Sequence, residues 1–235
     1  FYDPVAEKRC DWVGGGADLR KKIIRTIRPP DERFAEDHLR LLRAVRFAAQ
    51  LDFQIEPVTF TAIQATAPKI KTISAERIRD ELIKLFRPPH AARGLELLRY
   101  SGLLEHVLPE IAATAGCEQS PDYHPEGDVF THLCLMLRQL PTKADALLPW
   151  AALLHDVAKP VTASRDPKTG SIHFYEHEKI GARMTEQILE RLRFPRKQIE
   201  AVAVAVRHHM QFKDAPQMRK ATLRRLLLRE TFPLE

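Results

Sequence analysis

The stretch Ala35-Glu36-Asp37-His38-Leu39-Arg40-Leu41-Leu42-Arg43-Ala44-Val45-Arg46-Phe47 decides how the first half of the chain is interpreted. Its apolar residues recur at the spacing of one helix face, and the pattern continues to Ala49. A second stripe with the same spacing consists of Ile78, Leu82 and Leu85. Both stripes are typical of core residues. They predict a mainly α-helical fold, with helical structure from about residue 32 to residue 109.

Asp37 and Arg40 add a possible chemical function to this stretch. Residues three apart on a helix project from the same face, so a carboxylate and a guanidinium could both meet one planar ligand edge. Cytosine and adenine present an amino donor beside a ring-nitrogen acceptor, whereas uracil and guanine present a carbonyl and an N–H. An Asp acceptor and an Arg donor therefore suit C and A. The alternative is a solvated surface ion pair that contributes a few tenths of a kcal/mol.

The motifs around this pair occur in a recognisable order. They are Gly14-Gly15-Gly16-Ala17-Asp18-Leu19, Ile24-Arg25-Thr26-Ile27, Phe53-Gln54-Ile55 and Ser74-Ala75-Glu76-Arg77-Ile78-Arg79-Asp80-Glu81-Leu82. The order resembles the neck of the class II tRNA nucleotidyltransferase and bacterial poly(A) polymerase family, over roughly the first 110 residues. The resemblance implies that a Glu-Asp-x-x-Arg motif is a protein template for incoming ATP or CTP. The nucleotide-binding residues would be Glu36, Asp37, Arg40 and Arg43, and the partner would be the tRNA 3′ end.

The catalytic motif of that family, a Gly-Ser followed by an Asp-x-Asp pair that holds two Mg²⁺ ions, does not occur in these residues. We therefore expect a fragment without its Mg²⁺-dependent catalytic head, unable to add nucleotides by itself. Phe1-Tyr2 and the segment 9–13 flank a proline-containing turn. They predict a short N-terminal β-hairpin, a remnant of the head.

A second constellation begins near residue 113, where histidines and an aspartate occupy positions typical of metal ligands. It comprises His132, the pair His155-Asp156, His177 and the pair His208-His209. From about Tyr123 to Met210, this order resembles the HD superfamily of metal-dependent phosphohydrolases. The six residues are predicted metal ligands, and neutral imidazoles with a carboxylate suit Mn, Ni, Fe or Zn.

The resemblance also implies catalytic roles in this second half. His155, Asp156 and Lys159 are the predicted catalytic residues, with Lys159 holding a substrate phosphate or else acting as a helix C-terminal charge. HD domains normally add a last Asp from a later helix. Here only Asp214 follows, in a loop-like segment, so we expect the final ligand beyond residue 235.

Composition restricts the compartment and the partners. The net charge of +6 suits a polyanion, and the three cysteines are odd in number and scattered, which is typical of neither a disulfide framework nor a CxxC metal site. No apolar run approaches the ~18 residues of a membrane span. We expect a cytoplasmic protein that does not enter membranes, and the sequence leaves its oligomeric state open.

Three regions are predicted: residues 1–28 as the head remnant, 29–112 as a helical neck and body that binds nucleobases and RNA, and 113–235 as a helical HD domain. The function expected is that of part of a tRNA nucleotidyltransferase that adds C and A to the tRNA 3′ end. One alternative is a polynucleotide adenylyltransferase. Others are an HD phosphohydrolase acting on phosphomonoesters or 2′,3′-cyclic phosphates, with the neck as an RNA-binding scaffold, and a purely RNA-binding unit.

Overall fold

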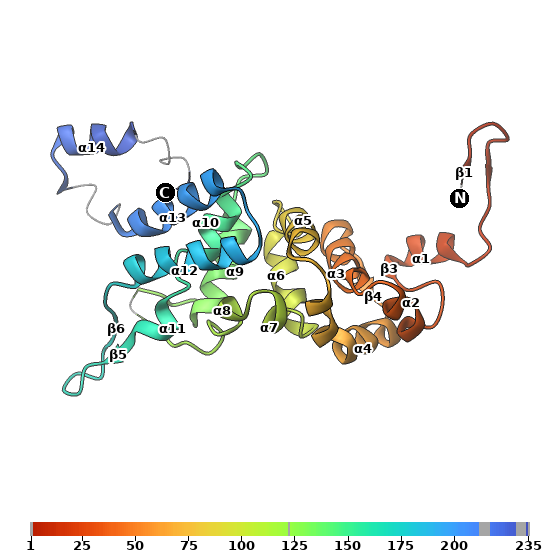
Figure 1. Ribbon diagram of the computed structural model, residues 1–235, viewed down its shortest axis with the longest axis horizontal. Coiled ribbons are helices and arrows are strands. Elements are labelled where there is room, and N and C mark those ends of the chain that lie inside the picture. Colours follow the sequence, from red (N-terminus) through yellow and green to blue (C-terminus); the bar gives the residue numbers. More distant parts are fainter. Residues whose placement is uncertain (1, 122, 212–216, 229–233, 235) are drawn as a thin grey trace.

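A computed structural model describes residues 2–121, 123–211, 217–228 and 234. Helices follow one another along an elongated molecule, with β1 at one end and α14 at the other (Figure 1). The mainly helical fold predicted from the sequence is confirmed. The strands form two-stranded pairs only, within the residues described.

The N-terminal part begins with the predicted hairpin. β1 (Tyr2–Asp3) pairs antiparallel with β2 (Lys8–Arg9), and Tyr2 lies opposite Arg9. α1 (Gly15–Lys21) follows, and the carboxylate of Asp11 accepts hydrogen bonds from the Gly15 and Gly16 N–H groups at 2.9 and 2.8 Å. A parallel pair that the sequence did not predict joins β3 (Ile23–Ile24) to β4 (Gln54–Ile55).

The middle of the chain is helical, as predicted. Its elements are α2 (Pro30–Glu36), α3 (Leu39–Leu51), α4 (Pro57–Thr66), the 3-10 helix η1 (Ala67–Thr72), α5 (Ala75–Leu85), α6 (Ala91–Tyr100), α7 (Leu104–Val107) and α8 (Pro109–Ala112). Both predicted apolar stripes are buried. They face each other because α3 packs against α5 and α6.

The second half carries the helices that position the candidate metal ligands. They are α9 (Val129–Gln139), α10 (Leu148–Leu154), α11 (Lys159–Thr162), α12 (His177–Arg191), α13 (Arg196–His208) and α14 (Lys220–Leu227). A hairpin of β5 (Ala163–Arg165) and β6 (Ile172–Phe174) separates α11 from α12. No helix among the described residues is both long and apolar enough to cross a membrane.

One apolar core runs through both halves of the chain. Trp150 of α10 packs edge-on against Phe86, at 5.5 Å between ring centroids, and against Phe194, at 4.9 Å. Glu110 of α8 and Arg191 of α12 form a two-contact ion pair at 2.5 and 2.8 Å. Since the core continues across residue 112, the helices on either side of this position hold each other in place.

Candidate metal centre and nucleotide-selecting turn

Four imidazoles converge on the carboxylate of Asp156. They belong to His132 within α9, His155 directly after α10, His177 at the start of α12 and His209 directly after α13. Asp156 Oδ2 lies 3.0 Å from His155 Nε2 and 3.8 Å from His132 Nε2. The other oxygen, Oδ1, lies 3.5 Å from His177 Nε2 and 3.8 Å from His209 Nε2. The carboxylate therefore belongs to two groups of three candidate ligands.

The Nδ1 atom of each of these rings forms a hydrogen bond with an acceptor outside the cluster. The Nδ1 atom of His132 lies 2.5 Å from Glu126 Oε1. The Nδ1–H groups of the other three rings donate to backbone carbonyls: His155 to Ala152 at 2.9 Å, His177 to Phe174 at 2.8 Å, and His209 to Val206 at 2.6 Å. A carbonyl oxygen can only accept, so Nδ1 carries the proton in these three rings. With Nδ1 bound to an acceptor, Nε2 is the nitrogen that faces the centre, which is the usual arrangement of metal-ligating histidines.

Lys159 also contacts the carboxylate. Its Nζ lies 2.8 Å from Asp156 Oδ2 and 2.5 Å from Gln119 Oε1, and both charged residues are buried. Burial would raise the pKa of Asp156, but the neighbouring His155 and Lys159 charges hold that pKa well below its usual value. Burial lowers the pKa of His209 to about 4, so this ring is neutral near pH 7 and able to act as a ligand.

His208 does not join this centre, contrary to the sequence-based prediction. Its Nδ1 lies 2.6 Å from Gln211 Nε2, and neither group of three includes it. Successive helical residues point about 100° apart, so only one of two adjacent histidines faces the cluster. Asp214, considered as a last ligand, lies outside the described residues.

Asp37 lies in a turn, and the expectation that it shares a helix with Arg40 is wrong. It follows α2 with extended backbone angles, φ −159° and ψ 105°, and α3 begins two residues later. The Asp37 Oδ1 atom accepts a hydrogen bond from the Leu39 N–H at 3.1 Å. This local side-chain contact competes with helix hydrogen bonding and explains the break. Arg77 of α5 binds Oδ2 at 2.8 Å.

Glu36 engages arginines beside this turn. It contacts Arg33 and Arg40, and Arg40 Nη1 also donates to the Arg33 carbonyl at 2.7 Å. Arg43 is exposed on α3. The four residues predicted to bind a nucleotide thus occupy one short segment. Glu36 holds the Arg40 guanidinium, a role that its position in the motif does not reveal.

Each half of the chain matches a known protein family. Residues 52–114 match the family described as "Probable RNA and SrmB- binding site of polymerase A", and residues 128–231 match the HD domain. The A-adding tRNA nucleotidyltransferase of Deinococcus radiodurans is 41% identical over 208 residues, which cover 85% of this chain and 47% of that protein. The chain is homologous to part of the tRNA nucleotidyltransferases.

Two further proteins support this relationship. The CC-adding tRNA nucleotidyltransferase of Thermus thermophilus is 37% identical over 236 residues, covering 93% of this chain and 52% of that protein. The crystal structure of the Bacillus stearothermophilus CCA-adding enzyme in complex with CTP superimposes with a TM-score of 0.63 at 26% identity, covering 91% of this chain and 44% of that one. The chain spans about half the length of the curated relatives it matches.

Beside the centre, His124 and Glu126 were not predicted as site residues. Glu126 Oε1 accepts from His132 Nδ1 and from His124 Nδ1, the latter at 3.1 Å. Burial would raise the pKa of Glu126, but its own backbone N–H and the two histidines lower that pKa to about 2. The Tyr123–Asp128 segment marked the start of the HD resemblance. The spacing of Glu126 and His132, however, gave no sign that a carboxylate orients the ring.

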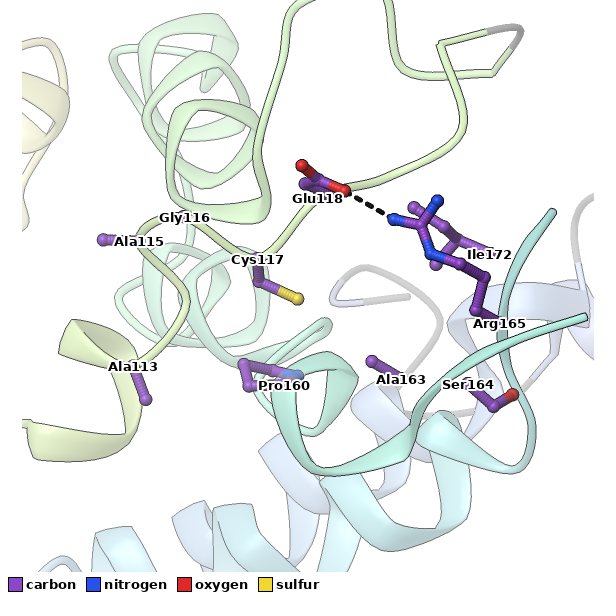
Figure 2. Close-up of a pocket in the computed structure, with 10 residues that line it drawn as sticks. All are labelled: Ala113, Ala115, Gly116, Cys117, Glu118, Pro160, Ala163, Ser164, Arg165 and Ile172. Carbon is purple, nitrogen blue, oxygen red and sulfur yellow. Dashed lines mark hydrogen bonds and ion pairs between the residues drawn. The ribbon is translucent and has the colours of Figure 1, made fainter. Parts of the chain in front are cut away.

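The candidate metal centre borders a cavity of about 800 Å³ whose other walls include Phe174 and Tyr175. A smaller cavity of about 440 Å³ lies close by, and Figure 2 shows the Cys117 sulfur pointing into it. Ile172 of β6 lines both cavities. The β5–β6 hairpin is therefore a shared wall, and the smaller cavity holds none of the residues that converge on Asp156.

Proposed function

We propose that this chain is the nucleotide-selecting and phosphohydrolase part of a tRNA nucleotidyltransferase, with residues 1–28, 29–112 and 113–235 as its three regions. The observation that carries the phosphohydrolase assignment is the set of four imidazoles whose Nε2 atoms face Asp156 while their Nδ1 atoms are bound to acceptors. Histidines that only fill a core have no reason to share one carboxylate in this orientation.

The donor set fits a divalent transition metal. His132, His155, His177, His209 and Asp156 would hold it, and imidazole nitrogens with one carboxylate suit Mn, Ni, Fe or Zn. Two Nε2 atoms, of His177 and His209, lie only 3.3 Å apart, a spacing at which two lone pairs repel unless a proton or cation lies near them. A bound metal would supply a water of lowered pKa for attack on a phosphoester.

The chain's own residues would orient one another and bind the substrate phosphate. His155 and Asp156 orient each other, with 3.0 Å between Nε2 and Oδ2. Lys159 neutralises Asp156 and offers three donors at the cavity wall, where a substrate phosphate can displace its contact with Gln119. Phosphomonoesters and 2′,3′-cyclic phosphates are the proposed substrates.

Base selection is the proposed role of the turn around Asp37. An oxygen of Asp37 would accept from the amino group of cytosine or adenine, and Arg40 would donate to the adjacent ring nitrogen. The partners are the tRNA 3′ end, ATP and CTP, with Mg²⁺ acting at a catalytic domain of the larger protein. A poly(A)-adding protein is the second candidate, because residues 52–114 match a family named after polymerase A. The proposed compartment is the cytoplasm, since none of the three cysteines forms a disulfide.

The test is hydrolysis of 2′,3′-cyclic AMP and of a phosphomonoester by the purified chain, with Ni²⁺ or Mn²⁺ added. We expect metal-dependent turnover that Asp156→Asn and His155→Gln each reduce by at least about 100-fold. The matched control is His208→Gln, because this neighbouring histidine contacts Gln211 and belongs to neither group of candidate ligands around Asp156. Equal activity in wild type and Asp156→Asn would leave the RNA-binding scaffold as the remaining interpretation.

A further inference from the structure

Helix α5 lies between α3 and the helices of the second half of the chain (Figure 1). One of its faces contacts the segment that carries the proposed nucleotide-selecting residues. Arg77 binds Asp37 at 2.8 Å, and Glu81 binds Arg46 of α3 at 2.6 Å through a pair of largely buried side chains. Residues four apart on a helix project from the same face, so Arg77 and Glu81 both face α3 and the turn before it.

The other face of α5 contacts the second half of the chain. Arg79 donates from Nη1 to the carbonyl of Arg193, which lies in the turn between α12 and α13. The Arg79 guanidinium also lies 6.0 Å from the centroid of the Phe194 ring. Successive helical residues point about 100° apart, so Arg79 projects nearly opposite to Arg77. The helix therefore links the nucleotide-selecting turn to the α12–α13 turn.

Aromatic rings continue this contact to the far end of α5. Phe194 packs against Trp150, at 4.9 Å between ring centroids, and Trp150 packs against Phe86 at 5.5 Å. Phe86 directly follows α5, seven residues after Arg79, which places both on the same face. All three rings are buried. A tilt of α5 away from the second half would open a gap in this packing, so the second half holds α5 at both ends.

The two groups that meet at Arg79 are each held by further hydrogen bonds. The N–H groups of Arg193 and Phe194 donate to carbonyls in the last turn of α12, each at 2.9 Å, and Arg193 has φ 59°. This is the Schellman pattern of a helix end, and it fixes the direction of the Arg193 carbonyl. Asp80 Oδ1 accepts from Arg79 Nε at 3.0 Å and from Nη2 at 2.8 Å, which leaves Nη1 directed at the turn.

We propose that the α12–α13 turn positions the nucleotide-selecting turn, and that Arg79 is the positioning residue through which it acts. The proposal rests on the proposed base selection by Asp37, and it gives the half of the chain with the candidate metal centre a second role. Arg79 fixes α5 against that half, and Arg77 on the opposite face then presents a fixed guanidinium to Asp37. Hydrogen bonds weaken steeply when their angle is poor, so a displaced Asp37 oxygen discriminates less between an amino group and a carbonyl.

The experiment measures single-turnover incorporation of all four nucleotides by the protein that joins this chain to a nucleotidyltransferase domain. Arg79→Met removes the donor and the charge while keeping an unbranched side chain beside Phe194. We expect the preference for C and A over U and G to fall about two- to fivefold, the usual size of coupling through residues outside a site.

Two control variants alter the same turn without removing the contact. Arg193→Gly keeps the accepting carbonyl and suits the left-handed backbone at this position. Arg196→Gln changes an exposed arginine on α13 that pairs with Glu190 and Glu200. Both variants should retain the wild-type preference, and a loss in either as large as that in Arg79→Met overturns the proposal.

A double variant separates positioning from general stabilisation. If Arg79 acts through Arg77, adding Arg79→Met to Arg77→Gln lowers the preference little further. Losses that simply multiply overturn the proposal, as does an unchanged preference in Arg79→Met. Lower total incorporation with an unchanged preference would likewise overturn it, because Arg79 would then only stabilise the fold.

Asp37→Ala in the same assay distinguishes the failure of the proposed function from the failure of this inference. An unchanged preference in Asp37→Ala refutes base selection by the turn, and the inference with it. A reduced preference in Asp37→Ala together with a wild-type preference in Arg79→Met refutes the positioning role alone.

Discussion

Arg77 of α5 holds Asp37 in place through an ion pair of 2.8 Å between Nη2 and Oδ2. Asp37 stands between two helices, and its other oxygen binds the Leu39 N–H. Arg77 therefore connects the turn to a helix 40 residues further along the chain. Burial by itself would raise the pKa of Asp37, but the contacts with Arg77 and Leu39 lower it. The carboxylate stays ionised and can act only as an acceptor.

This arrangement predicts that Arg77→Gln loosens base selection. The Asp37 carboxylate would lose its fixed partner, and we expect a three- to tenfold fall in the preference for C and A over U and G, from about 1 kcal/mol of lost positioning. The measurement is single-turnover incorporation by the protein that joins this chain to a nucleotidyltransferase domain. Glu76→Gln, an exposed change one residue earlier on α5, is the control. An unchanged preference in Arg77→Gln would show that the ion pair has no part in selection.

Removal of the Asp37 or the Arg40 side chain should reduce nucleotide discrimination more strongly than Arg77→Gln does. Asp37→Ala leaves the amino group of the base unpaired, and Arg40→Ala leaves the ring nitrogen unpaired, each at a cost of about 1–3 kcal/mol of discrimination. Misincorporation of U or G should rise about tenfold or more in both variants. Exchange of Arg43 should mainly affect phosphate contacts or packing. If Asp37 and Arg40 were only surface residues, both variants would lose a little stability and keep their nucleotide preference.

The sequence predicted the helices and the order of the histidines that gather around Asp156 better than it predicted the turn at Asp37. Histidines that converge in space were recognisable because their order along the chain, with His155 beside Asp156, is specific to one arrangement. The apolar stripes identified the core for a similar reason, since helical periodicity is local. The break at Asp37 depends on a side-chain hydrogen bond to Leu39, which competes with an otherwise helical pattern.

Long-range contacts account for the other differences. The parallel pairing of β3 with β4 joins two-residue strands, too short to show the alternation that indicates a strand. Glu126 is recognisable as a site residue only from its contact with His132 in the fold. His208 and His209 are equivalent in the sequence, and only the direction of the last turn of α13 distinguishes them.

Loss of Lys159 should destabilise the metal-free protein. Lys159→Met would leave the buried Asp156 carboxylate without its ammonium partner, and we expect a loss of about 3 kcal/mol in the free energy of unfolding. Added Ni²⁺ should restore much of that loss, because the metal replaces the missing positive charge. Urea denaturation with and without Ni²⁺ tests this. The account fails here if Lys159→Met is as stable as the wild type without metal.

The ion pair between Glu110 of α8 and Arg191 of α12 predicts that stability depends on pH. Burial would raise the pKa of Glu110, but Arg191 lowers it, so the folded state holds this carboxyl ionised to lower pH than the unfolded state does. The stabilisation is therefore fully present above the unfolded pKa of about 4.3 and is lost as the pH falls through the folded value. Glu110→Gln should cost about 1 kcal/mol at pH 7, and this cost should shrink as the pH falls through the folded pKa of Glu110.

Denaturant unfolding at several pH values measures this difference. The control is Glu190→Gln, which removes a more exposed pair with Arg196. We expect that variant to match the wild type at every pH. A constant offset between Glu110→Gln and the wild type, from pH 7 to pH 3, would mean that packing rather than charge is responsible.

Glu126 should affect metal affinity through His132. Glu126→Ala removes the acceptor that fixes the Nδ1–H of His132, and loss of such an outer contact typically weakens metal binding 10- to 100-fold. Glu126→Gln keeps an acceptor oxygen and should retain most of the affinity. Calorimetric titration with Ni²⁺ compares the two variants. Equal affinities in wild type and Glu126→Ala would exclude the positioning role.

The most direct test of the metal centre is a titration of the purified chain and its Asp156→Asn variant with Mn²⁺ and Ni²⁺, measured by calorimetry. Both groups of candidate ligands use an oxygen of Asp156, so one substitution affects them together. The wild type should bind the metal, and Asp156→Asn should bind it at least about 100-fold more weakly while its helical circular dichroism spectrum stays unchanged. Equal metal binding by the two proteins, or none by the wild type, would contradict the account.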